Sequence, residues 1–295
     1  MSSAVSAGLT SMSFVDAVLP LCRTQREREP RGGVYLVWDQ SGTPGARALW
    51  RGLDGAPRRA LLADHDARPD GASPVVFDVS GAVHDKRLQR GLRTLAEYAR
   101  FANALSLIDS PLELDALAAA LRERAFAQLP ERLVVVLRFF DTRTLPLLPR
   151  LLTPDQYAGF GSCAAGWYYL DREGCVRTLP RPAATVPFSG PLTFDDKQER
   201  MLIDDGVCDA VIDQLLDMRH PSLRDLNPPQ QHALIDRWTT AARRLGIAEI
   251  VDVVLFCCTA HQHGDDFARR APWCDKLAAY RSGTMRLDEA LDHAA

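Results

Sequence analysis

The amino-acid sequence predicts an α+β or α/β fold, in which an N-terminal mixed α/β lobe with a small sheet precedes a C-terminal lobe that is all helical. Up to about residue 183, short apolar runs alternate with helical patterns. Beyond residue 192, the apolar residues recur almost wholly at helical spacing. Because a proline-rich stretch separates these regions, we predict lobes at 1–183 and 193–295 that are joined by a linker at 184–192.

Strands of the N-terminal lobe are expected where β-branched or aromatic runs are bounded by turn residues. These runs lie at 34–38, 74–79, 133–139, 166–170 and 175–178. The sequence Asp-Arg-Glu-Gly at 171–174 predicts a hairpin-like turn between the last two strands. The run at 133–139 contains consecutive valines, which predicts a strand buried in the core that ends in charged residues.

Helices of the N-terminal lobe are expected between the second and third strands. Residues 86–106 place leucines and alanines on one face of an amphipathic helix. Ser110, Pro111 and Glu113 then supply an N-cap, a proline at the first helical position and a glutamate three residues after the cap, which predicts the start of a second helix. Its buried stripe is expected at Leu114, Leu117, Ala118 and Leu121.

In the C-terminal lobe, Thr193 is expected to cap a helix that runs to about Arg219. The inward face of this helix is expected to hold Val207, Val211, Leu215 and Met218. Asn227 and Pro228 open the next helix, which Gly246 ends. Further helices are expected at 250–263, before Gly264, and at 272–280.

Composition is that of an ordinary globular protein and suggests neither a nucleic-acid nor a membrane partner. The 295 residues are 46% hydrophobic and 25% charged, and the formal net charge is −3. This charge gives no electrostatic attraction to nucleic acid or to an anionic membrane, and no apolar run reaches the roughly 18 residues that a membrane helix needs. The seven cysteines form no CxxC pair and the N-terminus is a poor signal peptide, so a cytoplasmic location is expected.

Asp39 is the main candidate for an enzymatic interpretation. It follows the strand at 34–38 and begins the sequence Asp-Gln-Ser-Gly-Thr, which is similar to the DxDGT signature of Mg²⁺-dependent phosphatases with an aspartate nucleophile. The second acidic position of that signature is here Ser41, which cannot relay a proton near neutral pH. The alternative, which we favour, is a turn at the strand end in which Asp39 and Ser41 bond local backbone N–H groups.

Cys257, Cys258, His261 and His263 are candidate metal ligands. Cys257 and His261 are four residues apart, so both can face one ion on a helix, and Cys274 is the nearby soft ligand in sequence. The alternative, which we favour, is a buried cysteine pair and a histidine stabilised by the dipole of a helix C-terminus. No P-loop, GxGxxG or GxSxG motif occurs, and we expect neither a cofactor nor catalysis.

The charged segment 138–143 is the most informative part of the chain. Arg138, Asp141 and Arg143 end the apolar run, and charges at the end of a buried strand need partners. An enzymatic interpretation makes Asp141 a base and the arginines an anion clamp. The alternative is an internal ion-pair cluster that ties the strand end to the following helix, and it is favoured because no His, Ser or Cys nucleophile is adjacent.

One ordered set of residues carries a resemblance to a known family. The set is Arg138, Phe139, Asp141, Arg143, Phe160 and Trp167. It resembles the signature of the type VI secretion effector adaptors, in which an apolar strand leads through Arg-Phe-Tyr-Asp-Pro-Arg and a leucine-rich helix to an aromatic segment and a Trp-bearing strand. Phe140 and Thr142 replace the Tyr and Pro of that pattern. The strand ending at Asp39 and the blocks at 48–52, 73–77 and 241–247 are similar to other parts of the family.

The resemblance implies a non-catalytic role. Such adaptors, or effector chaperones, hold a toxic effector in the cytoplasm and load it onto the VgrG spike of the secretion tube. The implied partners are a cognate effector toxin and VgrG. We expect Arg138, Asp141 and Arg143 to form a structural clasp that shapes a surface for the client, which is bound by helix-in-groove contact or strand addition. A phosphotransferase built on Asp39 and a generic interaction module outside secretion are the alternatives.

Overall fold

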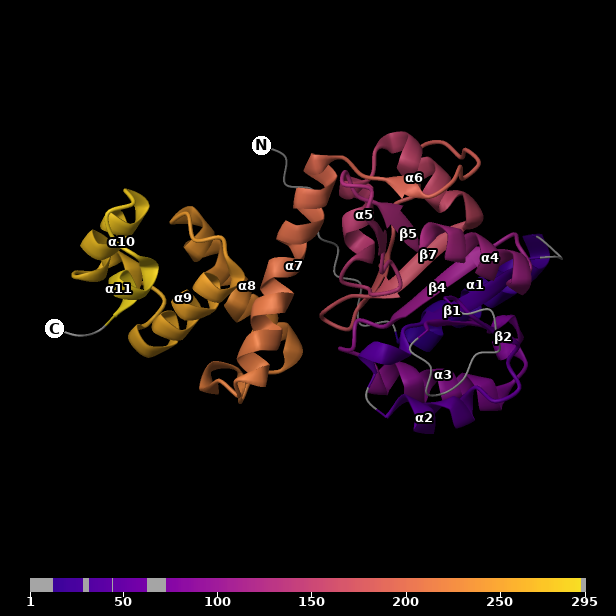
Figure 1. The fold of residues 1–295 in the computed structure, drawn as a ribbon. Helices are drawn as coiled ribbons and strands as arrows, with labels where there is room; N and C mark the ends of the chain where they lie inside the picture. Colours follow the sequence, from indigo (N-terminus) through magenta and orange to yellow (C-terminus); the bar gives the residue numbers. More distant parts are fainter. Residues whose placement is uncertain (1–12, 29–31, 44, 63–72, 293–295) are drawn as a thin grey trace, which may run out of the picture. The chain divides into compact units, whose positions relative to one another are not determined.

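The strands of the N-terminal part build a six-stranded sheet in the order β2-β3-β1-β4-β7-β8 (Figure 1). The computed structural model describes residues 13–28, 32–43, 45–62 and 73–292. Every neighbouring pair in this sheet is antiparallel, so the lobe is of the α+β kind. The strands are β1 Gly33–Trp38, β2 Arg58–Ala60, β3 Val75–Asp78, β4 Leu105–Ser110, β7 Gly166–Leu170 and β8 Val176–Thr178. The strands predicted at 34–38, 74–79, 166–170 and 175–178 are confirmed.

Helices cover both faces of this sheet, and every residue of β1 is buried. The flanking helices are α1 Phe14–Arg28, α3 Lys86–Tyr98 and α4 Leu114–Arg124. On one face, Leu36 and Trp38 of β1 share a core with Leu92 of α3. Tyr35 points to the other face, where its hydroxyl donates to the Leu112 carbonyl (2.7 Å) just before α4. The period of two along β1 therefore places its side chains in two different apolar layers.

The predicted helix at 86–106 is too long, because the chain turns after Tyr98 and continues as β4. β4 lies between β1 and β7 and all of its residues are buried, including the polar Ser106, Asp109 and Ser110, so its burial does not follow the polarity of its sequence. Ser110 is the last residue of β4 and not an N-cap. Its hydroxyl donates to the Cys163 carbonyl (2.6 Å), and Glu113 precedes the first residue of α4.

A second, three-stranded sheet has the order β6-β5-β9. Its strands are β5 Phe126–Gln128, β6 Val134–Val136 and β9 Leu192–Thr193. The predicted buried strand at 133–139 is wrong in two respects. Only Val134–Val136 is extended, and Leu133 and Val134 are 60% and 58% exposed. Val134 and Val136 of this edge strand are exposed, whereas Leu137 and Phe139 lie beyond the strand and are buried in the core.

Short helices make the remaining connections of this part. They are η1 Gln40–Gly42, α2 Ala46–Leu49, η2 Trp50–Gly52, η3 Ser80–Val83, η4 Leu145–Leu147, α5 Leu148–Leu151, α6 Pro154–Phe160 and η5 Gly161–Cys163. Thr153 begins α6 with a capping box, in which its hydroxyl accepts from the Gln156 amide and the Gln156 side chain accepts from the Thr153 amide.

The chain divides into two compact units, Met1–Glu199 and Arg200–Ala295. The predicted boundary at 184–192 stays a prediction, and Leu192–Thr193 pairs with β5 in the first unit. The helices of the C-terminal part are α7 Asp196–Asp217, η6 Pro221–Leu223, α8 Pro228–Arg244, α9 Ile250–His263, η7 Phe267–Arg269, α10 Trp273–Arg281 and α11 Leu287–Leu291. The helical character predicted for this part is confirmed.

The helix starts and stops of the C-terminal part follow local chemistry. Asn227 caps α8 in a capping box, and Gly246 and Gly264 adopt positive φ angles of 80° and 90° where α8 and α9 end. Two predictions are wrong. Thr193 lies in β9, and Asp195 instead accepts from the Gln198 amide (2.8 Å) at the start of α7. Met218, which was expected to face inward, is 60% exposed because α7 ends at Asp217.

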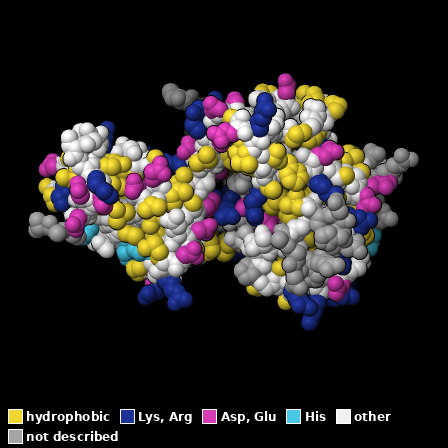
Figure 2. All heavy atoms as spheres, in the orientation of Figure 1, with side chains coloured by type: hydrophobic (Ala, Val, Ile, Leu, Met, Phe, Trp, Pro, Cys, Tyr) yellow, Lys and Arg dark blue, Asp and Glu magenta, His cyan; other side chains and the backbone are white. Residues whose placement is uncertain are grey.

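The core of the second unit joins all of its longer helices. It includes Val211, Leu215, Ile235, Trp238, Phe256 and Phe267. Large apolar side chains are also exposed, and hydrophobic side chains gather on the visible face of both units (Figure 2). Within the described part of the chain, no helix is both long enough and apolar enough to cross a membrane.

Gly91 supplies the close contact between α3 and η2 and provides a test of this packing. A Cβ at Gly91 would lie 2.0 Å from the Gly52 carbonyl oxygen. We therefore expect Gly91→Ala to lower the free energy of unfolding by about 1–3 kcal/mol, although alanine favours a helix by about 1 kcal/mol. Urea unfolding measures the change. Gly206→Ala in α7 is the control, because nothing lies within 4 Å of its Cβ position. Equal effects of the two substitutions would contradict the packing described.

Candidate functional site

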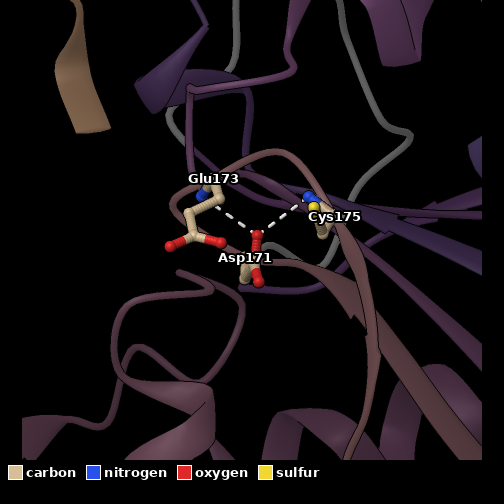
Figure 3. A group of neighbouring side chains, drawn as sticks. All are labelled: Asp171, Glu173 and Cys175. Atoms are coloured by element: carbon tan, nitrogen blue, oxygen red, sulfur yellow. Dashed lines mark hydrogen bonds between the residues drawn. The ribbon is translucent and has the colours of Figure 1, made fainter. Parts of the chain in front are cut away.

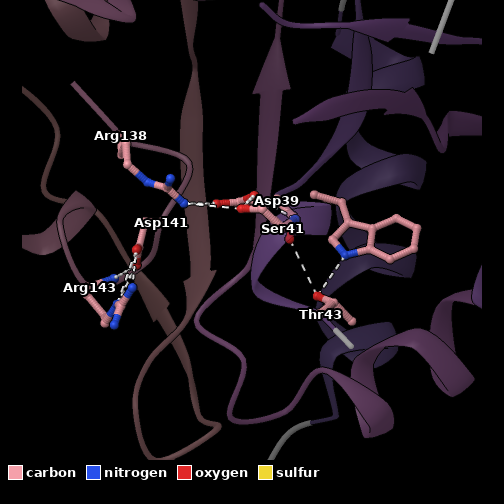
Figure 4. Close-up of polar contacts among 7 residues, drawn as sticks. Asp39, Ser41, Thr43, Arg138, Asp141 and Arg143 are labelled. Atoms are coloured by element: carbon pink, nitrogen blue, oxygen red, sulfur yellow. Dashed lines mark hydrogen bonds and ion pairs between the residues drawn. The ribbon is translucent and has the colours of Figure 1, made fainter. Parts of the chain in front are cut away.

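Asp39 and Arg138 form an ion pair that joins the end of β1 to the segment after β6 (Figure 4). The Arg138 Nη2 atom lies 2.7 Å from Asp39 Oδ2. The side chain of Asp39 is 3% exposed, whereas that of Arg138 is 50% exposed. The guanidinium also lies over the Phe140 ring, 5.4 Å from its centroid. Removal of the arginine would therefore leave a buried negative charge without its cation, whereas removal of the carboxylate would leave an arginine that water can still hydrate.

The other oxygen of Asp39 closes a turn. Asp39 Oδ1 accepts from the Ser41 amide (3.1 Å) and from the Ser41 hydroxyl (2.6 Å). Trp38 Nε1 donates to the Thr43 hydroxyl (3.1 Å) in the same turn. Both carboxylate oxygens of Asp39 are thus held by local or paired donors, as in the turn interpretation. Among the described residues, Asp39 belongs to no group of three metal-ligating side chains, so the geometry gives the phosphotransferase interpretation no support.

Asp141 and Arg143 form a second, separate ion pair. Asp141 Oδ2 accepts from Arg143 Nη2 (2.7 Å), and Oδ1 accepts from the Arg143 amide (2.9 Å) and Nε (3.0 Å). Between them, Thr142 donates its hydroxyl to the Leu170 carbonyl (2.6 Å) and its amide to the Asn103 carbonyl (2.8 Å). The expected three-residue clasp is therefore two pairs. The carboxylate bonded to Arg138 is Asp39 and not Asp141.

The aromatic residues of the ordered set lie together in the core. Phe139 meets Phe160 and Trp167 edge to face, with ring centroids 5.5 and 5.6 Å apart. Phe160 and Trp167 stack at 5.6 Å with an interplanar angle of 11°. All three side chains are buried. The geometry gives these residues a packing role and leaves none of them on the surface.

Arg124 is a buried charge that sequence reasoning missed. It is 3% exposed and donates to the carbonyls of Phe160 (2.8 Å) and Gly159 (3.0 Å) at the end of α6. It also donates to the Ala120 carbonyl (2.7 Å), and its guanidinium lies 4.3 Å from the centre of the Phe188 ring. Burial lowers the pKa of Arg124. The carbonyls carry the negative end of the α6 dipole, so they favour the cation at this site.

The cysteines and histidines of α9 do not converge on one point. Burial raises the pKa of the Cys257 thiol to about 12, and it also raises that of Cys258. The His261 ring packs against His220, with centroids 5.1 Å apart, while His263 packs against a different residue, Trp273, at 4.7 Å.

One group of three metal-ligating side chains occurs among the described residues, namely Asp171, Glu173 and Cys175 (Figure 3). It lies in the turn between β7 and β8. Asp171 Oδ1 accepts from the amides of Glu173 (3.0 Å) and Cys175 (2.8 Å), and Oδ2 accepts from Arg177 Nε (2.6 Å). These bonds occupy both oxygens of Asp171 and stabilise the predicted hairpin-like turn.

Comparison with known proteins gives one match. Residues 34–159 match a family model described as a domain of unknown function, DUF4123. The match contains β1, Asp39 and the segment 138–143, and it ends just before Phe160. No curated protein and no solved structure matches the chain.

The Arg124 contacts predict a large loss on substitution. We expect Arg124→Met to lower the free energy of unfolding by about 2–4 kcal/mol, because buried carbonyls at the end of α6 lose their donors. Arg124→Lys should rescue little, since one ammonium cannot reproduce a planar fork that reaches three carbonyls. Denaturant unfolding measures both changes. Arg90→Lys, at an exposed position of α3, is the control and should stay within about 0.5 kcal/mol of the parent. Full rescue by lysine would contradict the argument.

The asymmetric burial of Asp39 and Arg138 predicts unequal single substitutions. Arg138→Met should cost about 1–2 kcal/mol, because it leaves the Asp39 carboxylate buried without its cation. Asp39→Asn should cost less, since Arg138 is half exposed and its freed donors reach water. Arg59→Met breaks an ion pair with Asp115 that is exposed on both sides, and should cost at most about 1 kcal/mol. Thermal unfolding ranks the three variants, and a larger loss for Asp39→Asn than for Arg138→Met would refute the assignment.

Proposed function

We propose that this chain is a non-catalytic adaptor that binds a cognate toxic effector in the cytoplasm and loads it onto the VgrG spike of a type VI secretion system. The observation that carries the proposal is the match to DUF4123 at 34–159. That domain is associated with effector adaptors of this secretion system in general and is adaptor-like rather than a known catalytic family.

The geometry of the candidate residues supports the proposal. Asp39, Arg138, Asp141 and Arg143 pair with one another, and their carboxylates are nearly completely buried. A general base needs a carboxylate that can reach the proton of a substrate, and these carboxylates are instead buried and bonded to arginine, backbone and hydroxyl donors. Such residues suit a scaffold that holds a binding surface in a fixed shape.

Isolation of the chain from its native cell tests the proposal. We expect a tagged, full-length chain to bring down one toxin together with VgrG, both identified by mass spectrometry. In cells that lack VgrG, the toxin should still be recovered, because binding in the cytoplasm precedes loading. Removal of the gene for this chain should abolish secretion of that toxin and leave other effectors of the same system unchanged. Recovery of neither protein by a folded chain would overturn the proposal.

Asp141→Ala links the fold to client binding. Arg143 is 34% exposed and can reach water once its partner is removed, so we expect a loss of about 2–3 kcal/mol, below the 3–5 kcal/mol of a fully buried pair. Recovery of the toxin should fall together with the thermal midpoint. Asp115→Ala, which breaks an exposed pair, should change neither. An Asp141→Ala chain of parental stability that fails to bind the toxin would instead place Asp141 in direct contact with the client.

A further inference from the structure

The open edge of β6 is the feature from which we infer a binding site. β6 is the outermost strand of the three-stranded sheet, and β5 alone pairs with it among the described strands. Val134 and Val136 are 58% and 44% exposed, and Leu133 before them is 60% exposed. Proteins usually protect such edges with charges, prolines or bulges inside the strand. β6 has none of these within its three residues, and no other described strand pairs with its outer edge.

The register of the hairpin shows which backbone groups face the open edge. The Leu137 amide donates to the Ala125 carbonyl, and the Leu129 amide donates to the Leu133 carbonyl, both at 2.8 Å. Residues directly opposite each other in an antiparallel pair alternate between bonded and non-bonded. Positions 133, 135 and 137 therefore bond β5. The N–H and C=O groups of Val134 and Val136 point away from β5 and can bond an added strand.

The side chains of the same positions form a short apolar stripe, and a cation follows it in the chain. Val134 and Val136 are exposed, Phe126 opposite Val136 is 36% exposed beside them, and the half-exposed Arg138 lies just beyond the end of β6, where the Phe139 amide donates to the Leu137 carbonyl (2.8 Å) and turns the chain. Arg138 uses its Nη2 atom for Asp39 and Ser41. Its Nε and Nη1 donors have no partner among the described residues, so the exposed half of the guanidinium is available to a second carboxylate.

We propose that β6 binds an extended segment of the client by strand addition. The segment carries apolar residues two positions apart, which contact Val134, Val136 and Phe126, and an acidic residue next in line, which pairs with Arg138. This inference rests on the proposed adaptor function, because it names where and how the client is bound. Main-chain bonds to Val134 and Val136 provide affinity, and the valine stripe and arginine provide specificity.

The size of the surface favours a short peptide segment over a second copy of this chain. Stable specific complexes bury about 1,200 Å² or more in total. A three-residue strand with a few flanking side chains offers far less, so two chains joined only at this edge would not hold together. An extended segment of a client that also contacts the adaptor elsewhere needs only modest affinity here, because tethering raises its local concentration.

A random peptide library displayed on phage tests the site without knowledge of the client. The library is selected on the full-length chain, and the enriched sequences are synthesised with a fluorescent label and titrated. We expect enriched peptides to alternate apolar residues and to carry Asp or Glu next to the apolar pair, after it in a parallel strand and before it in an antiparallel one. Replacing that acidic residue by its amide should weaken binding to the parent chain about tenfold, the effect of one charge-assisted contact of about 1.4 kcal/mol.

Variants of the chain separate the two parts of the site. Val134→Lys combined with Val136→Lys removes the stripe, and Val136→Pro removes one outward N–H while leaving the β5–β6 bonds intact. Each should weaken the selected peptides at least about tenfold. Val251→Lys, at an exposed valine in the second unit, is the control and should leave binding unchanged. Thermal unfolding checks that each variant is folded, and the lysine variant suffices if Val136→Pro does not fold.

The outcomes distinguish this site from the adaptor function. Selected peptides that bind the lysine variant as well as the parent would overturn the β6 site. If the parent and the lysine variant recover the toxin equally from native cells, the adaptor function stands and the β6 site is wrong. If the parent recovers no toxin but its selected peptides require β6, the adaptor function fails while the strand-binding site remains.

Discussion

Two buried carboxylates determine the local structure around the end of β1 and the segment that follows β6. A carboxylate removed from water needs a cation or several donors, and Asp39 and Asp141 each have both. Arg138 reaches Asp39 across 99 residues of sequence, while Arg143 closes its pair locally. The two arginines bracket the residues that enter the core. Fixing their positions therefore also fixes Phe139 in its aromatic cluster.

The sequence predicts those parts of the fold that depend on residues close together in the chain, such as helix caps and helix ends. Capping by Asn227, termination at Gly246 and the strand at β1 were all visible in the sequence. The predictions fail where the position of a segment in the folded protein, and not its sequence pattern, determines its structure. β4 is buried on both faces, and its first residue, Leu105, continues the apolar spacing of the preceding helix, so the pattern predicts a helix that ends too late. β6 is apolar but lies at an edge, and no property of the run at 133–139 distinguishes an edge strand from a central one.

The sequence identifies the charged residues of the candidate site, but it does not show which of them form ion pairs with one another. Asp39 and the charged segment could be singled out because strand ends with charges need partners. That Asp39 and not Asp141 is the partner of Arg138 follows from tertiary contacts. Thr142 bonds the Asn103 and Leu170 carbonyls, and the Asp39 amide bonds the neighbouring Ala104 carbonyl, so the segment after β6 lies beside the end of β1. Arg124 had no signal in the sequence. Its partners are backbone carbonyls at the end of α6, which any residue provides, and only the three-dimensional structure brings them together.

The same geometry divides the charged residues by role. In the Asp141–Arg143 pair, both carboxylate oxygens of Asp141 accept from Arg143, two residues away, so this pair stabilises the local fold. Arg138 is different because only part of its guanidinium is exposed. One nitrogen holds a buried carboxylate, while the rest of the head lies at the end of an exposed valine stripe. A guanidinium fixed on one side loses less conformational freedom when it binds a second carboxylate on the other side. The ion pair that secures the fold thereby also holds Arg138 in place for the client contact proposed above.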